Sequence, residues 1–347
     1  YRIHMDPGMD DVNHPYITDV VTADMPLPTA PGEQVNWYQF KIPIEEYDHI
    51  QGNIRDFKSI RFVRMFLNDF SQTDAPVVLR FARLELVRNQ WRRYQFSLLD
   101  PGEYIPNDVG NETSFNVSSV SFEENSSRQP IPYVLPPGIE REEQLGGGAA
   151  TNTFLQNEQA LSMEICALND GDARAIYKAL NIDLRRYRRM QLDVHAEPLI
   201  GTAPPLDELE DGDLTVFMRL GSDFTQNFYE FEMPLLVTDQ FGLPTNETDL
   251  REEVWKNRLD IELKKFIEAK EARNSAGIDG FTPYVVENPD GSKITIIGNP
   301  TLGYVEEVMI GIRNPKDSAG LGDAFCTEVW VNELRPVSYT HLRAHET

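Results

Sequence analysis

The stretch Phe228-Tyr229-Glu230-Phe231-Glu232-Met233-Pro234-Leu235 decides the fold of this chain. From Tyr229 onward, apolar side chains occupy every second position, which is typical of a half-buried β-strand. An earlier stretch, Trp37-Tyr38-Gln39-Phe40-Lys41-Ile42-Pro43-Ile44, has the same order of aromatic, aromatic, polar, Phe, charged, apolar, Pro and apolar residues. The two stretches predict two related strands.

Two further matches extend this similarity. The segment Asp56–Arg64 matches Tyr304–Ile312, and the same offset places Glu85-Leu86 on Glu333-Leu334. Three matches in the same order predict an internal structural repeat. We therefore expect an all-β fold with a few short helices, made of two related, jelly-roll-like β-sandwich modules of which the first is truncated.

The remaining elements are short. A helix is predicted over Ala173–Leu180, because Asp170-Gly171-Asp172 forms an acidic cap before it. Another short helix is predicted to end at Arg273, and Asn288-Pro289-Asp290-Gly291-Ser292 is typical of a hairpin turn. Further strands are predicted over residues 59–67, 77–87, 115–122, 161–168, 187–195, 214–220, 257–263, 284–287, 293–297, 305–312 and 325–334.

Pro and Gly punctuation suggests the domain division. Residues 1–124 are predicted to form the C-terminal half of the first module, 125–153 a Pro- and Gly-rich linker, and 154–336 the complete second module. Residues 337–347 resemble translated sequencing-adapter DNA, and we expect them to be an artefactual tail without fold information. Because the chain opens at Tyr1 without an initiator methionine, we expect an internal fragment of a larger protein.

Charge excludes several classes of function. The 347 residues include 56 acidic and 32 basic side chains, for a formal net charge of −24. A surface this negative repels phosphate backbones, which argues against nucleic-acid binding and against docking on anionic membranes. No apolar run approaches the ~18 residues of a transmembrane helix.

The sequence offers little sign of catalysis. No nucleophile elbow and no phosphate-binding glycine loop is found, so we expect no catalytic residues and no cofactor. His195 is expected to be a satisfied or solvated histidine. The best metal candidate is an acidic run whose oxygen ligands would suit Ca²⁺, although a solvated loop is favoured; it comprises Asp207, Glu208, Glu210, Asp211 and Asp213.

A basic cluster surrounds Tyr187. In a chain this acidic, ion pairing within the molecule is expected instead of nucleic-acid contact. The cluster consists of Arg185, Arg186, Arg188 and Arg189.

Cys166 and Cys326 are the two cysteines of the chain. They lie on the first and last predicted strands of the second module, and such strands commonly run side by side in a sandwich. A disulfide would indicate an oxidising compartment, whereas two buried free thiols would be structural. The sequence leaves both possibilities open.

Several strings together resemble one family. They are Ile54–Leu67, Val78–Arg88 with Trp91–Tyr94, Tyr133–Ile139, Asn157–Leu161, Gly171–Lys178 and Glu328–Arg335. The chain resembles, from about Asn36 to Arg335, the SprA/Sov family of very large cell-surface proteins of Bacteroidota.

The resemblance implies a role in transport. Members of this family form the outer-membrane translocon of the type IX secretion system, and gliding motility in many of these bacteria depends on it. We therefore expect a region in the aqueous phase at the outer membrane or cell surface. The implied partners are the rest of the same translocon chain, other secretion-system proteins and transiting secreted proteins.

Two rival classes of protein remain. A cell-surface carbohydrate-binding adhesin would need exposed aromatic side chains on a concave sheet, and Trp37, Tyr38, Phe228 and Tyr229 are the candidates. A secreted enzyme is disfavoured, because the sequence shows no paired acid and base.

Overall fold

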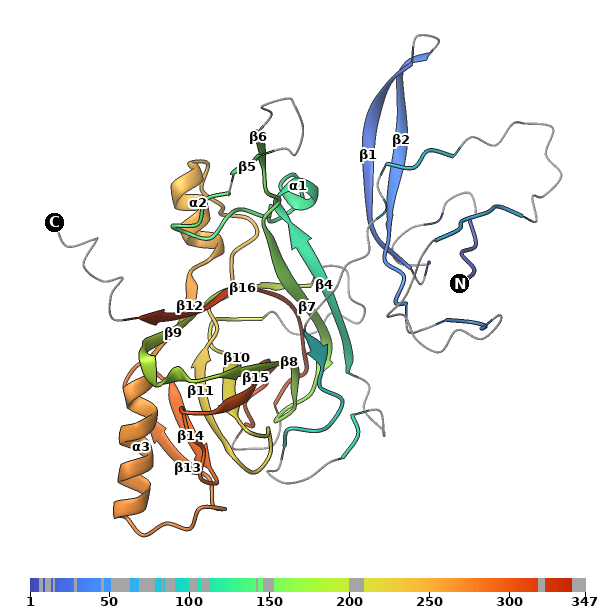
Figure 1. Cartoon of the computed structure of the whole chain (residues 1–347). Coiled ribbons are helices and arrows are strands. Elements are labelled where there is room, and N and C mark those ends of the chain that lie inside the picture. The colour runs from blue at the N-terminus through green and yellow to red at the C-terminus, as the bar shows by residue number, and fades with distance from the viewer. Residues whose placement is uncertain are drawn as a thin grey trace. The chain divides into compact units, whose positions relative to one another are not determined.

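The computed structural model describes residues 1–5, 9, 14, 16–27, 30–44, 47–50, 63–68, 79–82, 84, 91–99, 105–107, 113–141, 143–145, 153–199, 209–317 and 322–338. The chain divides into two compact units, Tyr1–Leu84 and Glu85–Thr347. Figure 1 shows the course of the chain through both.

The first unit contains an antiparallel hairpin. Its strands are β1 (Ile17–Leu27) and β2 (Ala30–Phe40), with Val21 opposite Trp37. Described residues 63–67, 79–82 and 84 are not in strands, so the strands predicted over 59–67 and 77–87 are wrong there. The other residues of those two segments lie outside the described residues.

The internal repeat is therefore tested only in part. Most of Asp56–Arg64, and all of Glu85-Leu86, lie outside the described residues. The remaining match, between the stretches that begin at Trp37 and at Phe228, joins strands with different neighbours. Strand β2 pairs with β1, whereas β11 (Phe228–Pro234) lies between β10 (Thr215–Gly221) and β14 (Lys293–Ile297).

The second unit contains two large antiparallel sheets (Figure 1). The seven-stranded sheet has the order β13-β14-β11-β10-β15-β8-β3. Its other strands are β13 (Tyr284–Glu287), β15 (Val305–Arg313), β8 (Ala173–Ile182) and β3 (Arg92–Arg93). The five-stranded sheet has the order β12-β9-β16-β7-β4. Its strands are β12 (Asn257–Glu262), β9 (Tyr187–Pro198), β16 (Phe325–Ser338), β7 (Gln159–Leu168) and β4 (Ser114–Ser121).

Short elements complete this unit. They are α1 (Phe122–Asn125), the small hairpin β5 (Glu143–Leu145) and β6 (Thr153–Leu155), the 3₁₀ helix η1 (Leu184–Arg186), α2 (Glu247–Val254) and α3 (Leu263–Ser275). The mostly-β character predicted from the sequence is confirmed. Among the described residues, none of the helices has the length and apolar character needed to cross a membrane.

The apolar faces of the two sheets form one core. In β10, Val216, Met218 and Leu220 point into it, and in β9 the inward side chains are Leu192 and Val194. Because successive side chains of a strand point to opposite faces, the residues between them lie on the outer faces. This alternation makes the unit a sandwich of two sheets.

The domain boundary differs from the sequence-based one. Strand β4 pairs with β7 from Ser114↔Cys166 to Ser121↔Gln159, and β3 pairs with β8. Residues before 125 therefore complete both sheets of the second unit, and the division in the structure falls between Leu84 and Glu85. The cause is non-local strand pairing, which Pro and Gly punctuation does not report.

The end of the fold also shifts. Val337 pairs with Arg189 and Ser338 with Tyr187, so both belong to β16. The expected tail therefore loses its first two residues to the sheet, and residues 339–347 lie outside the described residues.

The predicted helix over Ala173–Leu180 is wrong. These residues form β8, which pairs with β15 from Arg313↔Ala173 to Val305↔Ile182. The acidic turn before it is real: the Asp172 carboxylate accepts a 2.8 Å hydrogen bond from the Ala173 N–H. Tertiary pairing overrode a local cap signal. The later predictions hold better, since β12 leads into α3 and β13–β14 form a hairpin with Gly291 at φ 81°.

Candidate functional site

The acidic loop is described only from Leu209 onward, and Asp207 and Glu208 lie outside the described residues. The Asp211 carboxylate accepts a 2.6 Å hydrogen bond from the Val237 N–H, and that of Asp213 accepts one of 2.7 Å from the Glu210 N–H. No group of three or more potential metal ligands occurs within the described part of the chain. Two of the three described carboxylates thus hold the loop backbone, and the Ca²⁺ site stays a prediction.

The two cysteines lie on neighbouring strands, β7 and β16, as predicted. The structure pairs Cys166 with Cys326 as a disulfide, with their Cα atoms 3.9 Å apart. The register shifts at this point, between the pairs Phe325↔Leu168 and Thr327↔Ile165. A bulge therefore brings both sulfurs to the same side, which strict alternation would not guarantee.

His195 lies in a buried polar network on the outer face of the five-stranded sheet. Its Nδ1 is 2.8 Å from the Val254 carbonyl oxygen, and its ring stacks on Trp330 with centroids 4.2 Å apart. Its Nε2 is 3.7 Å from Glu197 Oε1, too far for a hydrogen bond, and has no other hydrogen-bond partner among the described residues. The expectation of a satisfied or solvated histidine is therefore met at Nδ1 alone.

Arg128, from the segment that follows α1, joins this network on the outer face of the five-stranded sheet. Its guanidinium donates to Glu197 and to Glu328, each at 2.5 Å, and it lies over the Trp330 ring at 5.2 Å. Burial opposes ionisation of Glu197, but the approach of His195 and the ion pair with Arg128 outweigh it and hold the pKa of Glu197 below its ordinary value. Residues 126–141, hereafter the long cover, carry Arg128 across this face.

The long cover is anchored by further polar contacts. The Tyr133 hydroxyl donates to Glu158, which also accepts from Asn332. Burial raises the pKa of Glu158. The Trp255 indole N–H donates to the Val134 carbonyl at 2.7 Å. These contacts make the Pro-rich stretch part of the fold.

The outer face of the seven-stranded sheet holds a second ionic cluster. Arg219 pairs with Glu230, and Arg313 pairs with both Glu230 and Glu232. Burial opposes ionisation of Glu230, but the charges of Arg219 and Arg313 outweigh it and lower the pKa of Glu230 to about 2. Burial also lowers the pKa of Arg219, yet a guanidinium keeps its charge in proteins, so the pair is ionic.

The aromatic residues proposed for carbohydrate stacking are not on a free surface of this sheet. Phe228 and Tyr229 are 1% and 2% exposed. Phe228 lies beneath the Arg219 guanidinium at 4.2 Å, and the Tyr229 hydroxyl donates to the Pro300 carbonyl at 2.9 Å. The segment Arg92–Leu98, hereafter the short cover, packs Tyr94 and Leu98 on the same face. Trp37 and Tyr38 belong to β2 in the first unit.

Three of the four arginines in the basic cluster form ion pairs within the molecule, as expected. Arg185 forms a two-pronged ion pair with Asp183, Arg188 pairs with Glu262, and Arg189 pairs with Asp260 at 2.7 Å. The hydrogen bond from Arg185 lowers the pKa of Asp183 to about 2.

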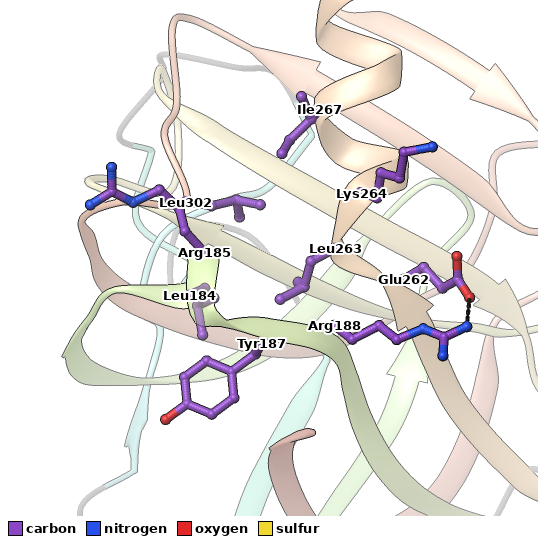
Figure 2. A pocket seen from close by; sticks show the side chains of 9 residues that line it. All are labelled: Leu184, Arg185, Tyr187, Arg188, Glu262, Leu263, Lys264, Ile267 and Leu302. Atoms are coloured by element: carbon purple, nitrogen blue, oxygen red, sulfur yellow. Dashed lines mark hydrogen bonds and ion pairs between the residues drawn. The ribbon is translucent and has the colours of Figure 1, made fainter. Parts of the chain in front are cut away.

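Beside this cluster lies the candidate functional site, a pocket of about 360 Å³. Its apolar surface comes from Leu184, Leu263, Ile267 and Leu302, with Tyr187 at the edge. Its charged residues are Arg185, Arg188, Lys264 and Glu262. Figure 2 shows the leucines facing the pocket, and Arg188 reaching to Glu262.

Three separate parts of the chain build this pocket. They are η1 with the start of β9, the junction of β12 and α3, and the turn before β15. The Leu184 N–H donates to the Leu302 carbonyl at 2.8 Å, which ties the first part to the third. The arrangement can hold an apolar side chain and, at its rim, an anionic group.

The sequence identified Arg185 and Arg188 as part of a basic cluster but missed Lys264, Ile267 and Leu302. One signal was available in the first turn of α3, which contains Lys264 and Lys265 and no acidic residue. Acidic residues are preferred there because of the helix dipole. Two lysines in the first turn are therefore unfavourable for the helix itself, although Glu262 stands at the N-cap before them.

Three carbohydrate-binding modules are among the solved structures that match this chain. One is the family 11 module of cellulosomal cellulase Lic26A-Cel5E of Clostridium thermocellum, with 7% identity and a TM-score of 0.31, covering 73% of this chain and 89% of that chain. Another is the family 11 module from Clostridium thermocellum in complex with a mixed-linked tetrasaccharide, with 9% identity and a TM-score of 0.32, covering 73% of this chain and 91% of that chain. The third is the mannan-recognising module TmCBM27, with 12% identity and a TM-score of 0.23, covering 65% of this chain and 99% of that chain.

No curated protein matches this chain. A family model does match: its description is "Motility related/secretion protein", SprA_N, and the match spans residues 1–346.

Proposed function

Because the chain belongs to the SprA_N family of motility related/secretion proteins, we propose that it is an extramembrane β-sandwich region of an outer-membrane translocon. The translocon would serve type IX protein secretion and gliding motility. The proposed partners are the rest of the same translocon chain, other secretion-system proteins and transiting secreted proteins. Neither enzymatic activity nor a cofactor is part of the proposal.

The burial pattern of the second unit supports an aqueous location. Both sheets turn their apolar faces toward each other, and their outer faces carry ion pairs such as Arg219–Glu230 and Arg128–Glu197. A surface that faced lipid would instead expose apolar side chains outward. This inward burial, together with the family match, is the observation that carries the proposal.

The carbohydrate-binding alternative is not favoured. It needs aromatic rings on an accessible face, and Phe228 and Tyr229 are buried beneath an ion pair and against the core. No described contact of the second unit supports it.

Accessibility labelling in cells tests the location. Phe241 is 97% exposed, so Phe241→Cys in the full-length protein presents a reactive thiol to water. Labelling by a membrane-impermeant maleimide in intact cells would place the region outside the cell. Labelling only after the outer membrane is permeabilised would place it in the periplasm.

The matched control is Leu220→Cys, because Leu220 is fully buried and should react only after denaturation. Failure of Phe241→Cys to react before denaturation under either condition would contradict an extramembrane location. Deletion of residues 91–338 from the full gene should stop secretion into the medium. Undiminished secretion by that strain would contradict the transport role.

A further inference from the structure

We infer that the pocket at η1 and α3 is a docking site for an acidic peptide segment of a partner protein, in which one large apolar side chain lies between carboxylates. The inference concerns a binding site and does not depend on the location tested above. It follows from the size of the pocket, its apolar floor and the charges at its rim.

The size of the pocket suits a side chain better than a cofactor. At about 360 Å³, it is at the small end of the roughly 300–1,000 Å³ typical of ligand pockets. Leu184, Leu263 and Leu302 are at most 4% exposed and form a fixed floor, whereas Ile267 is 44% exposed at the edge. A Leu, Ile, Phe or Tyr side chain inserted here would cover Ile267 and remove its apolar surface from water.

The charges select an acidic partner. Three basic side chains and one carboxylate line the pocket, on a chain whose formal net charge is −24. Because Asp183, Glu262 and Glu268 pair with these three cations, the rim is close to neutral on a chain that is otherwise strongly negative. A carboxylate that approaches here therefore meets cations instead of the acidic excess of the chain as a whole. In Figure 2 the head groups of Arg185 and Lys264 lie on opposite sides of the pocket, so carboxylates on both sides of a central apolar residue would meet a cation.

The basic groups differ in how they are held. Asp183 fixes Arg185 through two hydrogen bonds of 2.9 and 2.7 Å. Arg185 also packs closely against Gly303, where a Cβ atom would come within 3.0 Å of the Arg185 Cζ. Arg188 is held more loosely, at 3.4 Å from Glu262. Lys264 has a 76% exposed side chain and an exposed partner, Glu268. Exposed ion pairs of this kind contribute little to stability, so a partner's carboxylate can replace Glu268 at little cost.

A peptide-binding assay on the 347-residue chain tests the inference. The probes are four fluorescein-labelled five-residue peptides, each with two Glu residues, then one Leu, Ile, Phe or Tyr, then two more Glu residues. A matched set carries Gln in place of every Glu. Fluorescence polarisation at low salt should show a Kd between roughly 10 µM and 1 mM for at least one Glu peptide. Its Gln counterpart should bind about tenfold more weakly.

The first turn of α3 offers a matched pair of variants. Lys264 and Lys265 are both exposed in that turn, but only Lys264 lines the pocket. Lys264→Glu and Lys265→Glu change the net charge equally, and each puts a carboxylate in the first turn of the helix. Lys264→Glu also replaces the ion pair with Glu268 by a like-charge pair, so the stability of each variant is measured alongside binding. Lys264→Glu should weaken peptide binding about tenfold, and Lys265→Glu much less. Ile267→Gln should weaken binding without changing its salt dependence.

Three results would overturn the inference. They are the absence of binding by all four Glu peptides up to about 1 mM, equal binding by the Gln set, and an equal loss in the Lys264→Glu and Lys265→Glu variants. Thermal unfolding of each variant confirms that a loss of binding is not a loss of fold.

Discussion

The outer face of the five-stranded sheet buries Glu197 and Glu328 beneath Arg128, whereas that of the seven-stranded sheet buries Glu230 between Arg219 and Arg313. On the seven-stranded face, all three partners belong to the sheet itself, on β10, β11 and β15. On the five-stranded face, the cation comes from the long cover. The cluster on the seven-stranded face is therefore complete once that sheet forms, whereas the cluster on the five-stranded face is complete only when residues 126–141 dock.

This difference teaches how a Pro-rich segment becomes part of a fold. Two carboxylates taken out of water on one sheet face are unfavourable unless a cation reaches them. Arg128 supplies that charge and also stacks on Trp330. Docking of the long cover is thus coupled to burial of the carboxylates, in addition to the apolar contacts of Ile131 and Tyr133.

The largest expected effect is on the seven-stranded face. Glu230→Ala would leave Arg219 buried without its carboxylate, and we expect the free energy of unfolding to fall by about 3–5 kcal/mol. Urea denaturation measures it. Glu268→Ala, which removes an exposed partner, is the control and should cost less than about 1 kcal/mol. A Glu230→Ala loss as small as that of the control would mean that the cluster is solvated.

Next in size is the disulfide, which ties β7 to β16 in the five-stranded sheet. The two cysteines are 160 residues apart, and a bridge over a long loop typically contributes about 2–4 kcal/mol by restricting the unfolded chain. Denatured, oxidised protein should show no free thiols, and reduction should lower the stability by this amount. Two titratable thiols before reduction would show that the bridge does not form.

Arg128→Met should have a somewhat smaller effect, about 2–3 kcal/mol, because the Arg128 side chain is 26% exposed and water can reach the carboxylates it leaves. The loss should shrink as the pH falls below about 4.3, because the pKa of Glu197 is held below its ordinary value in the folded chain and the unfolded chain then takes up the proton first. Arg185→Met, at an exposed pair, is the control. A loss independent of pH would indicate that packing on Trp330, not charge, holds the long cover.

The smallest effect is a difference in pH dependence between the two faces. Burial raises the pKa of Glu158, so its contribution to stability is full below its unfolded pKa of about 4.3 and is lost as the pH rises through the folded pKa. Glu230, with a pKa lowered to about 2, contributes above about 4.3 and loses that contribution as the pH falls toward 2.

Above about pH 4.3, therefore, Glu158→Gln should become more stable relative to the unmodified chain as the pH rises. Glu230→Gln should become less stable relative to it as the pH rises from about 2 to 4.3, and should change little above that. Denaturation curves at several pH values between about 2 and 7 measure both trends. Parallel trends for the two variants would remove the electrostatic distinction between the faces.

Local patterns located most strands of the second unit but not its extent. Alternation placed β9, β10, β11, β15 and β16 correctly, because each has one face in a common core and its sequence records that burial. It failed for β8, where an acidic turn resembled a helix cap. The boundary also differed, because β4 was assigned to the first module and the long cover to a linker. Pairing between residues such as Ser114 and Cys166 depends on distant sequence, which periodicity does not contain.

The sequence by itself determined the mostly-β character, the family resemblance, the ion pairing of the arginine cluster and the adjacency of the two cysteine-bearing strands. Each rests on residue type, on short-range order or, for the cysteines, on a general rule of sandwich closure. Only the tertiary structure decided that Phe228 and Tyr229 are buried. It alone brought Arg185, Lys264 and Leu302 around one pocket. These outcomes depend on which distant segments cover a face or meet at its end, and that is set by packing between sheets.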